Sequence, residues 1–406
     1  ERPIETILSG PAASIVGARW LTGVDDALVS DIGGTTTDVA VLRGGKPAID
    51  PSGARVGGFQ TMVEAVAMRT TGLGGDSQVH TKAEGLSGGL ILGPRRVLPV
   101  SFIAVDAAEV VHSALERQLN APLPNEHDGR FVFAQKGMNS IGLTDRELLL
   151  LHRIEGQVHP VGDVLRNRLE QGTLKRLWDR GMVQVADITP SDANHVLGRL
   201  DCWDREAAEK ALTLFSRRRI GSGKVLATGP QDLAEMIIEQ LTKQTVLALL
   251  ETAIEEDAED FGLPAAQLAR HVLMQRGLAG HRGMLSLDAA LNSDVVGLGA
   301  SAPVYYPAVG ERLHCRMILP QHAGVANAIG AVVLGSAGFP GAPIFDPGEV
   351  ATAQFDVDPT AHRFLSFLSM LIPSNDAFFG NADPLALFDS LGDFVGDITI
   401  SVLGSN

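Results

Sequence analysis

The chain has 406 residues, of which 45% are hydrophobic, 45 are glycines and 21 are prolines. This length exceeds a typical single domain, and the composition is that of a turn-rich α/β protein that can bury a substantial core. The formal charge of −15, from 33 basic and 48 acidic residues, disfavours nucleic acid as a partner and offers no basic patch for a membrane surface.

No window of about 18 apolar residues occurs, so we expect no membrane-spanning segment. Cys202 and Cys315 are the only cysteines, without zinc or Cys-x-x-Cys spacing, and this favours a reducing, cytoplasmic location. The start, Glu1-Arg2-Pro3-Ile4-Glu5, has neither an initiating Met nor the basic and apolar blocks of a signal peptide. We therefore expect a fragment of a longer protein.

The first predicted element is a helix within residues 5–20. Ser9 can cap it, Pro11 suits its first turn, and small residues at 12, 13, 17 and 18 permit close packing.

The next stretch is Asp31-Ile32-Gly33-Gly34-Thr35-Thr36-Thr37-Asp38, between apolar runs at 27–30 and 39–42. This pattern predicts strand, tight turn and strand. The two glycines let backbone N–H groups approach a ligand, and the three threonines add hydroxyl donors. Asp31 and Asp38 supply hard oxygen ligands that suit Mg²⁺ or its waters. The stretch is a candidate phosphate-binding hairpin; the alternative is an ordinary type I′ or II′ hairpin with a polar tip.

A second glycine-rich segment, residues 71–77, follows. Gly74 and Gly75 offer backbone N–H groups, and Asp76 offers a carboxylate. A plain turn explains the same residues equally well.

The middle of the chain is mainly helical by its apolar spacing. We expect a helical insertion over about residues 140–220, in which the helix pair at 161–182 carries no catalytic constellation, and a long helix at 232–261. Around residues 189–199, Asp192, Asn194 and His195 either cap a helix or line a cleft, and the helix-start preference favours the cap.

Residues 294–302 predict a buried strand followed by a glycine-rich turn that contains Gly297, Gly299 and Ser301. His322 precedes a small-residue helix at 325–334, and we interpret it as a helix-entry residue without chemistry.

Three segments accompany the hairpin: Leu8-Ser9-Gly10-Pro11-Ala12-Ala13-Ser14-Ile15-Val16-Gly17-Ala18, Thr71-Gly72-Leu73-Gly74-Gly75-Asp76-Ser77 and Pro320-Gln321-His322-Ala323-Gly324-Val325-Ala326-Asn327-Ala328-Ile329-Gly330-Ala331. Together the four resemble the hydantoinase/oxoprolinase A-subunit family of the actin-like ATPase superfamily, over roughly Glu1 to Gly335. The resemblance implies an α/β fold, with an actin-like (ribonuclease H-like) ATPase domain over residues 1–336.

The resemblance also implies a function, namely ATP-dependent hydrolysis of a cyclic amide or imide of the hydantoin or 5-oxoproline type. ATP and Mg²⁺ would be required, with Asp31 and Asp38 as catalytic and metal-holding residues. The nucleotide would meet the following residues: Gly33, Gly34, Thr35, Thr36, Thr37, Gly74, Gly75, Asp76, Gly297, Gly299 and Ser301.

Two alternatives remain open. One is an ATP-dependent carboxylase subunit of the same family. The other is a non-catalytic actin-like subunit, because the hairpin corresponds to the second of two phosphate loops and the first is absent from this chain. A second hydantoinase-type subunit or a preceding domain would then be the partner.

Residues 337–406 differ in character, with nine of the 15 phenylalanines and nine acidic residues but only one basic residue, Arg363. Short apolar runs between Pro, Gly, Asn and Asp predict a β-rich tail. It resembles, in part, the C-terminal half of a spondin-type domain; a diverged β element is the alternative.

Overall fold

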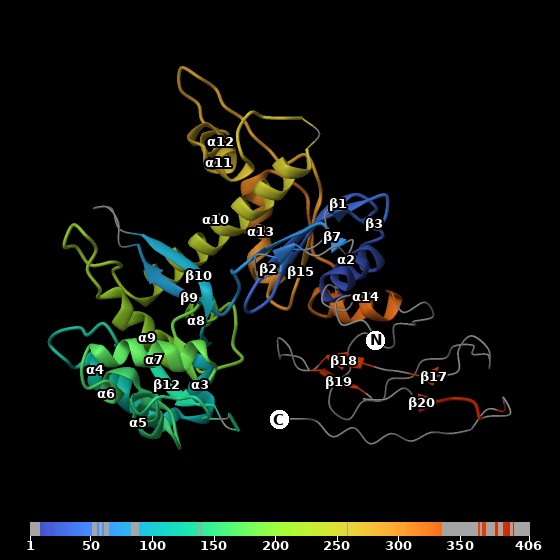
Figure 1. Cartoon of the computed structure of the whole chain (residues 1–406). Helices are drawn as coiled ribbons and strands as arrows, with labels where there is room; N and C mark the ends of the chain where they lie inside the picture. Colours follow the sequence, from blue (N-terminus) through green and yellow to red (C-terminus); the bar gives the residue numbers. More distant parts are fainter. Residues whose placement is uncertain are drawn as a thin grey trace. The chain divides into compact units, whose positions relative to one another are not determined.

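A computed structural model describes residues 9–50, 55–56, 59–60, 65–82, 89–135, 137–138, 140–257, 259–334, 364–365, 368–370, 378–380, 385–389 and 393. The chain divides into two compact units. The first comprises Glu1–Gly33, Thr37–Thr70 and Val246–Asn406, and the second comprises Gly34–Thr36 and Thr71–Thr245. Helices and strands alternate, so the expected mixed α/β fold is confirmed (Figure 1).

The first unit is built on a mixed sheet in the order β16-β15-β1-β2-β3, with β8 also paired to β2. β1 is antiparallel to β2 and parallel to β15, which is parallel to β16. The strand bounds are β1 (Ala27–Ile32), β2 (Thr37–Arg43), β3 (Lys46–Pro47), β8 (Met68–Thr71), β15 (Val295–Leu298) and β16 (Met317–Ile318).

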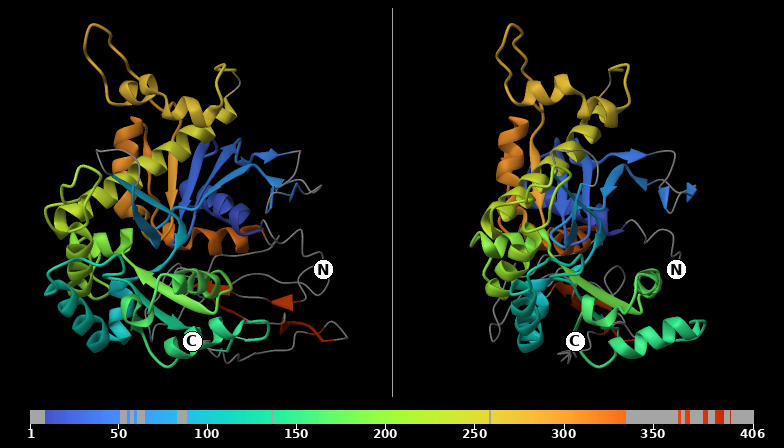
Figure 2. Two further views of the ribbon diagram at one scale, coloured as in Figure 1. Left: turned by 60° about the vertical axis from the view of Figure 1, so that its left-hand side comes forward. Right: turned by 90° about the vertical axis from the view of Figure 1, so that its left-hand side faces the viewer.

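Two helices, α2 (Ser9–Thr22) and α14 (Ala326–Leu334), lie side by side against this sheet (Figures 1 and 2). A Cβ on Gly17 would lie 1.9 Å from the Ala326 carbonyl oxygen, and one on Gly330 would lie 1.7 Å from the Ala13 carbonyl oxygen. The small residues therefore allow the two backbones to touch, which confirms the predicted close packing of these helices.

Successive side chains of β1 point to opposite faces of the sheet, because side chains alternate along a strand. Val29 packs into the core shared with α2. Ser30 instead lies 2.7 Å, hydroxyl to hydroxyl, from Tyr306 of α13 (Ala302–Leu313). The remaining elements of this unit are α11 (Ala265–Arg270), α12 (Val272–Leu278), η1 (Ala323–Val325) and the short strands β4 (Ile49–Asp50), β5 (Arg55–Val56), β6 (Phe59–Gln60) and β7 (Ala65–Val66).

The second unit contains a four-stranded sheet in the order β11-β14-β12-β13 and a separate β9-β10 hairpin. Helices pack against that sheet around a core that includes Val132, Leu150 and Leu177. The bounds are β9 (Ser77–Thr81), β10 (Leu90–Arg96), β11 (Leu98–Pro99), β12 (Phe131–Ala134), β13 (His159–Pro160), β14 (Val183–Asp187), α3 (Val100–Asp106), α4 (Ala108–Leu119), α5 (Asp145–Ile154), α6 (Val161–Val164), α7 (Leu169–Asp179), α8 (Pro190–Val196) and α9 (Arg205–Ser216).

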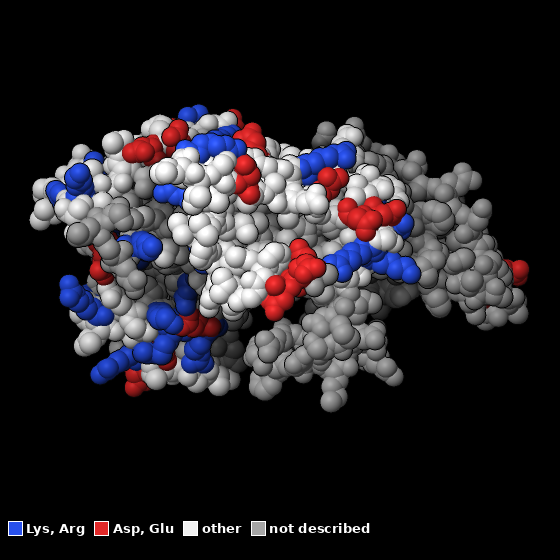
Figure 3. All heavy atoms as spheres, turned by 90° about the horizontal axis from the view of Figure 1, so that it is seen from above, with Lys and Arg blue, Asp and Glu red and all other residues white. Residues whose placement is uncertain are grey.

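The long predicted helix is α10 (Pro230–Glu256), whose residues up to 245 belong to the second unit and the rest to the first. Within the described parts of the chain, no helix combines the length and apolarity needed to cross a membrane. In the view from above in Figure 3, Lys and Arg side chains lie next to Asp and Glu side chains on the described surface. The chain also has many surface ion pairs, such as Arg117–Asp163, Lys175–Asp179 and Arg282–Asp288.

The β-rich tail falls mostly outside the described residues. Those that are described form four short strands: β17 (Phe364–Leu365), β18 (Leu368–Met370), β19 (Phe378–Gly380) and β20 (Leu385–Ala386). The spondin-type resemblance and the division at residue 336 stay predictions.

Candidate functional site

The predicted hairpin is confirmed: β1 and β2 pair in antiparallel register and are joined by residues 33–36. Asp31 lies directly opposite Asp38, so both carboxylates are on the same face of the sheet. They line a cavity of about 110 Å³ together with Ser14 of α2 and Asn327 of α14. The fold thus places two like charges beside each other at the end of β1.

Asp31 is electrostatically unusual. Burial raises its pKa from 3.8 to about 6, the hydrogen bond from Ser14 lowers it, and the neighbouring charge of Asp38 raises it again. Ser14 Oγ donates to Asp31 Oδ2 at 2.7 Å. Among the described residues Asp31 forms no ion pair with Lys, Arg or His. Asp31 can therefore take up a proton or attract a cation.

The hairpin tip presents some of its predicted ligand groups and hides others. Gly33 and Thr35 are exposed and Thr36 is half-buried, whereas Gly34 and Thr37 are buried. Thr37 begins β2 opposite Ile32. The accessible residues of the tip are thus Gly33, Thr35 and Thr36.

The predicted glycine turn after β15 meets the end of β1. Gly299 has a φ of +108°, and a Cβ there would lie 2.1 Å from the Ile32 carbonyl oxygen, so only glycine fits. Ser301 follows as the N-cap of α13 and makes no capping bond with its side chain. The N-terminus of α13, which attracts anions, therefore lies near the hairpin. Gly297 instead lies inside β15, where a Cβ would be 2.7 Å from the Tyr306 ring.

The glycine-rich loop at residues 71–77 is held by hydrogen bonds within the loop and to Gly34, and by an ion pair with Arg96. The Gly74 N–H donates to Ser77 Oγ at 2.8 Å, and the Asp76 N–H donates to the Gly34 carbonyl at 2.8 Å. The Asp76 carboxylate pairs with Arg96 at 3.0 Å. These bonds account for the loop as a structural turn, and a nucleotide contact by Gly74, Gly75 or Asp76 stays a prediction.

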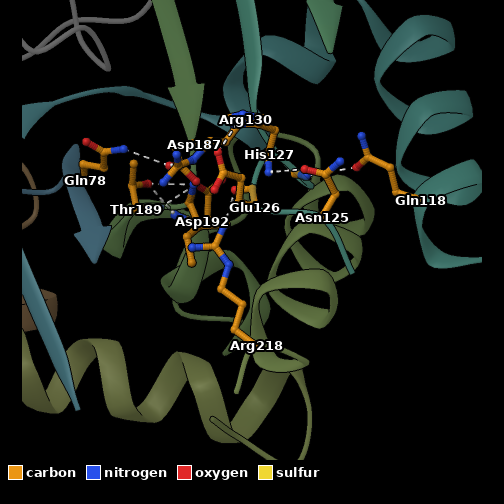
Figure 4. Close-up of polar contacts among 12 residues, drawn as sticks. Gln78, Gln118, Asn125, Glu126, His127, Arg130, Asp187, Thr189, Asp192 and Arg218 are labelled. Carbon is orange, nitrogen blue, oxygen red and sulfur yellow. Dashed lines mark hydrogen bonds and ion pairs between the residues drawn. The ribbon is translucent and has the colours of Figure 1, made fainter. Parts of the chain in front are cut away.

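At α8, the N-cap is Thr189, and of the three residues considered only Asp192 takes part in capping, from the third helical position; Asn194 and His195 lie inside the helix. Thr189 and Asp192 form a reciprocal capping box, and Asp192 also accepts hydrogen bonds from the backbone and hydroxyl of Ser101 (Figure 4). His195 is fully buried; its Nδ1 donates to the Ser191 carbonyl and its Nε2 accepts from the Trp203 N–H. These polar residues stabilise the second unit.

His322 has a left-handed backbone, with φ of +69°, and its buried Nδ1 has no hydrogen-bond partner among the described residues. Both features are uncommon for a histidine. Its neighbour Ala323 accepts a hydrogen bond from the Gly299 N–H at 3.0 Å, so this segment fixes the glycine turn.

The residues present suit a hydrated Mg²⁺ in one respect: two carboxylates line a small cavity, and Mg²⁺ is commonly held by one or two carboxylates while it keeps several waters. Within the described ranges, no group of three or more His, Cys, Asp or Glu side chains forms a protein-only metal cage. Any ion at Asp31 and Asp38 would therefore need water or ligand oxygens to complete its coordination.

Ser14 and Asn327 were not predicted as site residues. Both lie within segments that carry the family resemblance, which was the available signal, but nothing local distinguishes them from helix surface residues. Only the packing of α2 and α14 under the hairpin brings them to the aspartates.

Comparison with known proteins gives a family match and two structural likenesses. The Hydantoinase/oxoprolinase family model matches residues 1–334. No curated protein matches the sequence significantly. A nucleotide-free structure of acetone carboxylase, from work on ATP-dependent acetone carboxylation, is 18% identical with a TM-score of 0.45, over 80% of this chain and 32% of that one. An ATP-dependent caprolactamase from Pseudomonas jessenii is 17% identical with a TM-score of 0.44, over 82% and 33%. This chain thus spans about a third of each.

Proposed function

The chain belongs to the hydantoinase/oxoprolinase family, and from that premise we propose that it takes part in ATP-dependent hydrolysis of a cyclic amide or imide. The observation that carries the proposal is the pair Asp31 and Asp38, set across from each other at a glycine-threonine turn beside a helix N-terminus. Such a turn suits phosphate, and the carboxylates suit the cation that accompanies it.

The chemical problem is the stability of the amide. Its carbonyl is a poor electrophile, and its oxygen is a poor leaving group. Transfer of the γ-phosphoryl group of ATP to the amide oxygen releases ADP and makes the amide carbon electrophilic. Water then adds to that carbon, the ring C–N bond breaks with the nitrogen leaving as an amine, and a second water hydrolyses the resulting acyl phosphate to a carboxylate and inorganic phosphate. The protein contributes mainly by positioning the reactants and neutralising phosphate charge.

The hairpin tip supplies the positioning. The N–H groups of Gly33 and Gly34 and the hydroxyls of residues 35–37 would bind the β- and γ-phosphates, with the accessible Gly33, Thr35 and Thr36 first in reach. Gly299 and Ser301 would meet the adenosine or its phosphates at the start of α13.

The aspartates supply negative charge at the same place. Asp31 and Asp38 would hold Mg²⁺ or its waters, and the ion would neutralise phosphate charge. With a pKa of about 6, Asp31 is mostly ionised at pH 7.5, the state that attracts a cation. Ser14 keeps one oxygen of Asp31 in place.

The test is ATP turnover and ATP binding by the chain with 5-oxoproline, hydantoin or caprolactam, compared with Asp38→Asn. We expect the variant to lose ATP turnover by about 100-fold or more, because a charge that acts at the phosphates is removed. Asp288→Asn, which removes an exposed carboxylate of the same unit, should leave turnover unchanged. Failure of the intact chain to bind ATP would contradict the proposal.

The same assay includes acetone with bicarbonate. ATP turnover that requires acetone and bicarbonate, and not a cyclic amide, would replace the proposed hydrolysis reaction with a carboxylation reaction. ATP binding without turnover on any substrate would instead favour the non-catalytic subunit.

A further inference from the structure

The second unit contains a cavity of about 520 Å³ between the loop at residues 122–129 and the segment 162–171 that leads into α7. This volume is in the usual range for small-molecule pockets, roughly 300–1,000 Å³. None of its lining residues belongs to the candidate site of the first unit. The cavity therefore needs its own explanation.

Both walls of the cavity are fixed by hydrogen bonds of their own. In the loop, Asn125 accepts from the His127 N–H at 3.1 Å, and the Asn125 N–H donates to Asp128 at 2.7 Å (Figure 4). On the other wall, Asn167 accepts from the first N–H groups of α7 at 3.0 and 3.3 Å. A site with preformed walls loses little entropy when a ligand binds.

Positive charge on the cavity comes from Arg166 and Arg168, which both line it. Neither guanidinium forms an ion pair with any residue that the structure describes. Nearby arginines differ: Arg153 pairs with Glu170 at 2.6 Å and Arg176 with Glu147 at 2.8 Å. The cavity arginines thus keep their planar donor groups available for a carboxylate or phosphate.

At one end of the cavity, the side-chain carboxylate of Glu126 already contacts two other lining residues. Gln171 Nε2 donates to Glu126, and His127 Nε2 lies 3.1 Å from the same carboxylate. Burial lowers the pKa of His127, and a proton on Nε2 lets the ring donate to Glu126. The Glu126 side chain is 63% exposed and is free to turn outward.

From this arrangement we propose that the cavity binds a small organic anion with carboxylate or phosphate groups. Arg166 and Arg168 hold one anionic group, and the ligand's other anionic group takes the place of Glu126 against Gln171 and His127. The N-terminus of α7 adds a favourable dipole at the same wall.

The test is isothermal titration calorimetry of the full chain with citrate, as the carboxylate probe, and glycerol 3-phosphate, as the phosphate probe, at matched ionic strength. We expect saturable binding of at least one probe and about tenfold or more weaker binding in the double variant Arg166→Ala/Arg168→Ala. The double variant Arg146→Ala/Arg199→Ala, which removes two exposed arginines elsewhere, should bind as the wild type does.

A second variant tests the exchange with Glu126. Glu126→Gln removes the competing charge and should strengthen binding of the same probe by about three- to tenfold. Absence of binding by both probes, or equal weakening in the two arginine double variants, would overturn the proposal. Unchanged or weaker binding in Glu126→Gln would overturn the displacement of Glu126, even if the arginine variants are misfolded. Binding of only one probe identifies the anionic group that the cavity accepts.

Discussion

Two carboxylates in this protein, one in each unit, have pKa values shifted in opposite directions. Asp31, at the end of β1, has a pKa raised to about 6. Glu147, at the start of α5, has a pKa lowered to about 2, although its side chain is only 4% exposed. Burial raises the pKa of both groups; at Asp31 it is the largest cause, whereas at Glu147 the hydrogen bonds from Thr144 and Arg176 outweigh it.

The neighbours of Glu147 are donors. It accepts from the Thr144 N–H at 2.8 Å, the Thr144 hydroxyl at 2.9 Å and Arg176 Nε at 2.8 Å. Asp31 has the single hydroxyl of Ser14 and faces the carboxylate of Asp38. A carboxylate with full donor partners stabilises its own unit, whereas a pair of like charges lowers stability until a cation or proton joins it. This contrast separates the candidate site from the structural polar network.

Of the substitutions that test the contrast between Asp31 and Glu147, Asp31→Asn should have the largest effect on stability. The folded pKa of about 6 exceeds the unfolded value of 3.8, so the stabilising contribution of Asp31 is fully present below pH 3.8 and is lost as pH rises through 6. By pH 7.5 the charged form costs about 2–3 kcal/mol. The variant should therefore gain stability relative to wild type by about that amount between pH 4 and pH 7.5, measured by urea unfolding at both pH values. A difference that does not change with pH would break the contrast.

A smaller effect of opposite sign is expected for Glu147→Gln. The folded pKa of Glu147 lies below its unfolded value of 4.5, so its contribution is present above pH 4.5 and is lost as pH falls toward 2. We expect the variant to be about 1–2 kcal/mol less stable at pH 7, with a deficit that shrinks on acidification. Urea unfolding over pH 3–7 measures this deficit. A variant as stable as wild type at pH 7 would show that the capping box contributes little.

The smallest effect is expected for Ser14→Ala. Loss of its hydrogen bond should raise the pKa of Asp31 further and lower the free energy of unfolding at pH 7.5 by about 1 kcal/mol or less. The stability difference between each protein, with or without Ser14, and its own Asp31→Asn variant is followed over pH. The pH at which this difference is half complete should be higher for Ser14→Ala than for wild type. In the double variant Ser14→Ala/Asp31→Asn the shift should vanish, and its persistence there would assign it to another group.

The hairpin was predictable from sequence because its signals are local. Apolar runs on both sides of Gly33 and Gly34 predict two strands and a turn, and the structure confirms β1 and β2. The helix cap at Asp192 was predictable for the same reason, since a capping box spans only four residues. The nucleotide roles of the predicted site residues stay predictions.

Other features of the candidate site had no local signal. Ser14 lies 17 positions before Asp31, and Asn327 comes from a helix near the other end of the described chain. The difference between Gly297, which packs against Tyr306, and Gly299, which touches the hairpin backbone, was also invisible in the pattern.

The sequence by itself determined the family, the strands and turn of the hairpin, and the presence of two aspartates at its ends, because motif, alternation and turn chemistry act between near neighbours in the chain. Only the tertiary structure decided that Asp31 and Asp38 face the same cavity, that Ser14 donates to one of them, and that the pKa of Asp31 rises. The physical reason is that strand register, burial and donor supply are set by contacts between segments far apart in the sequence.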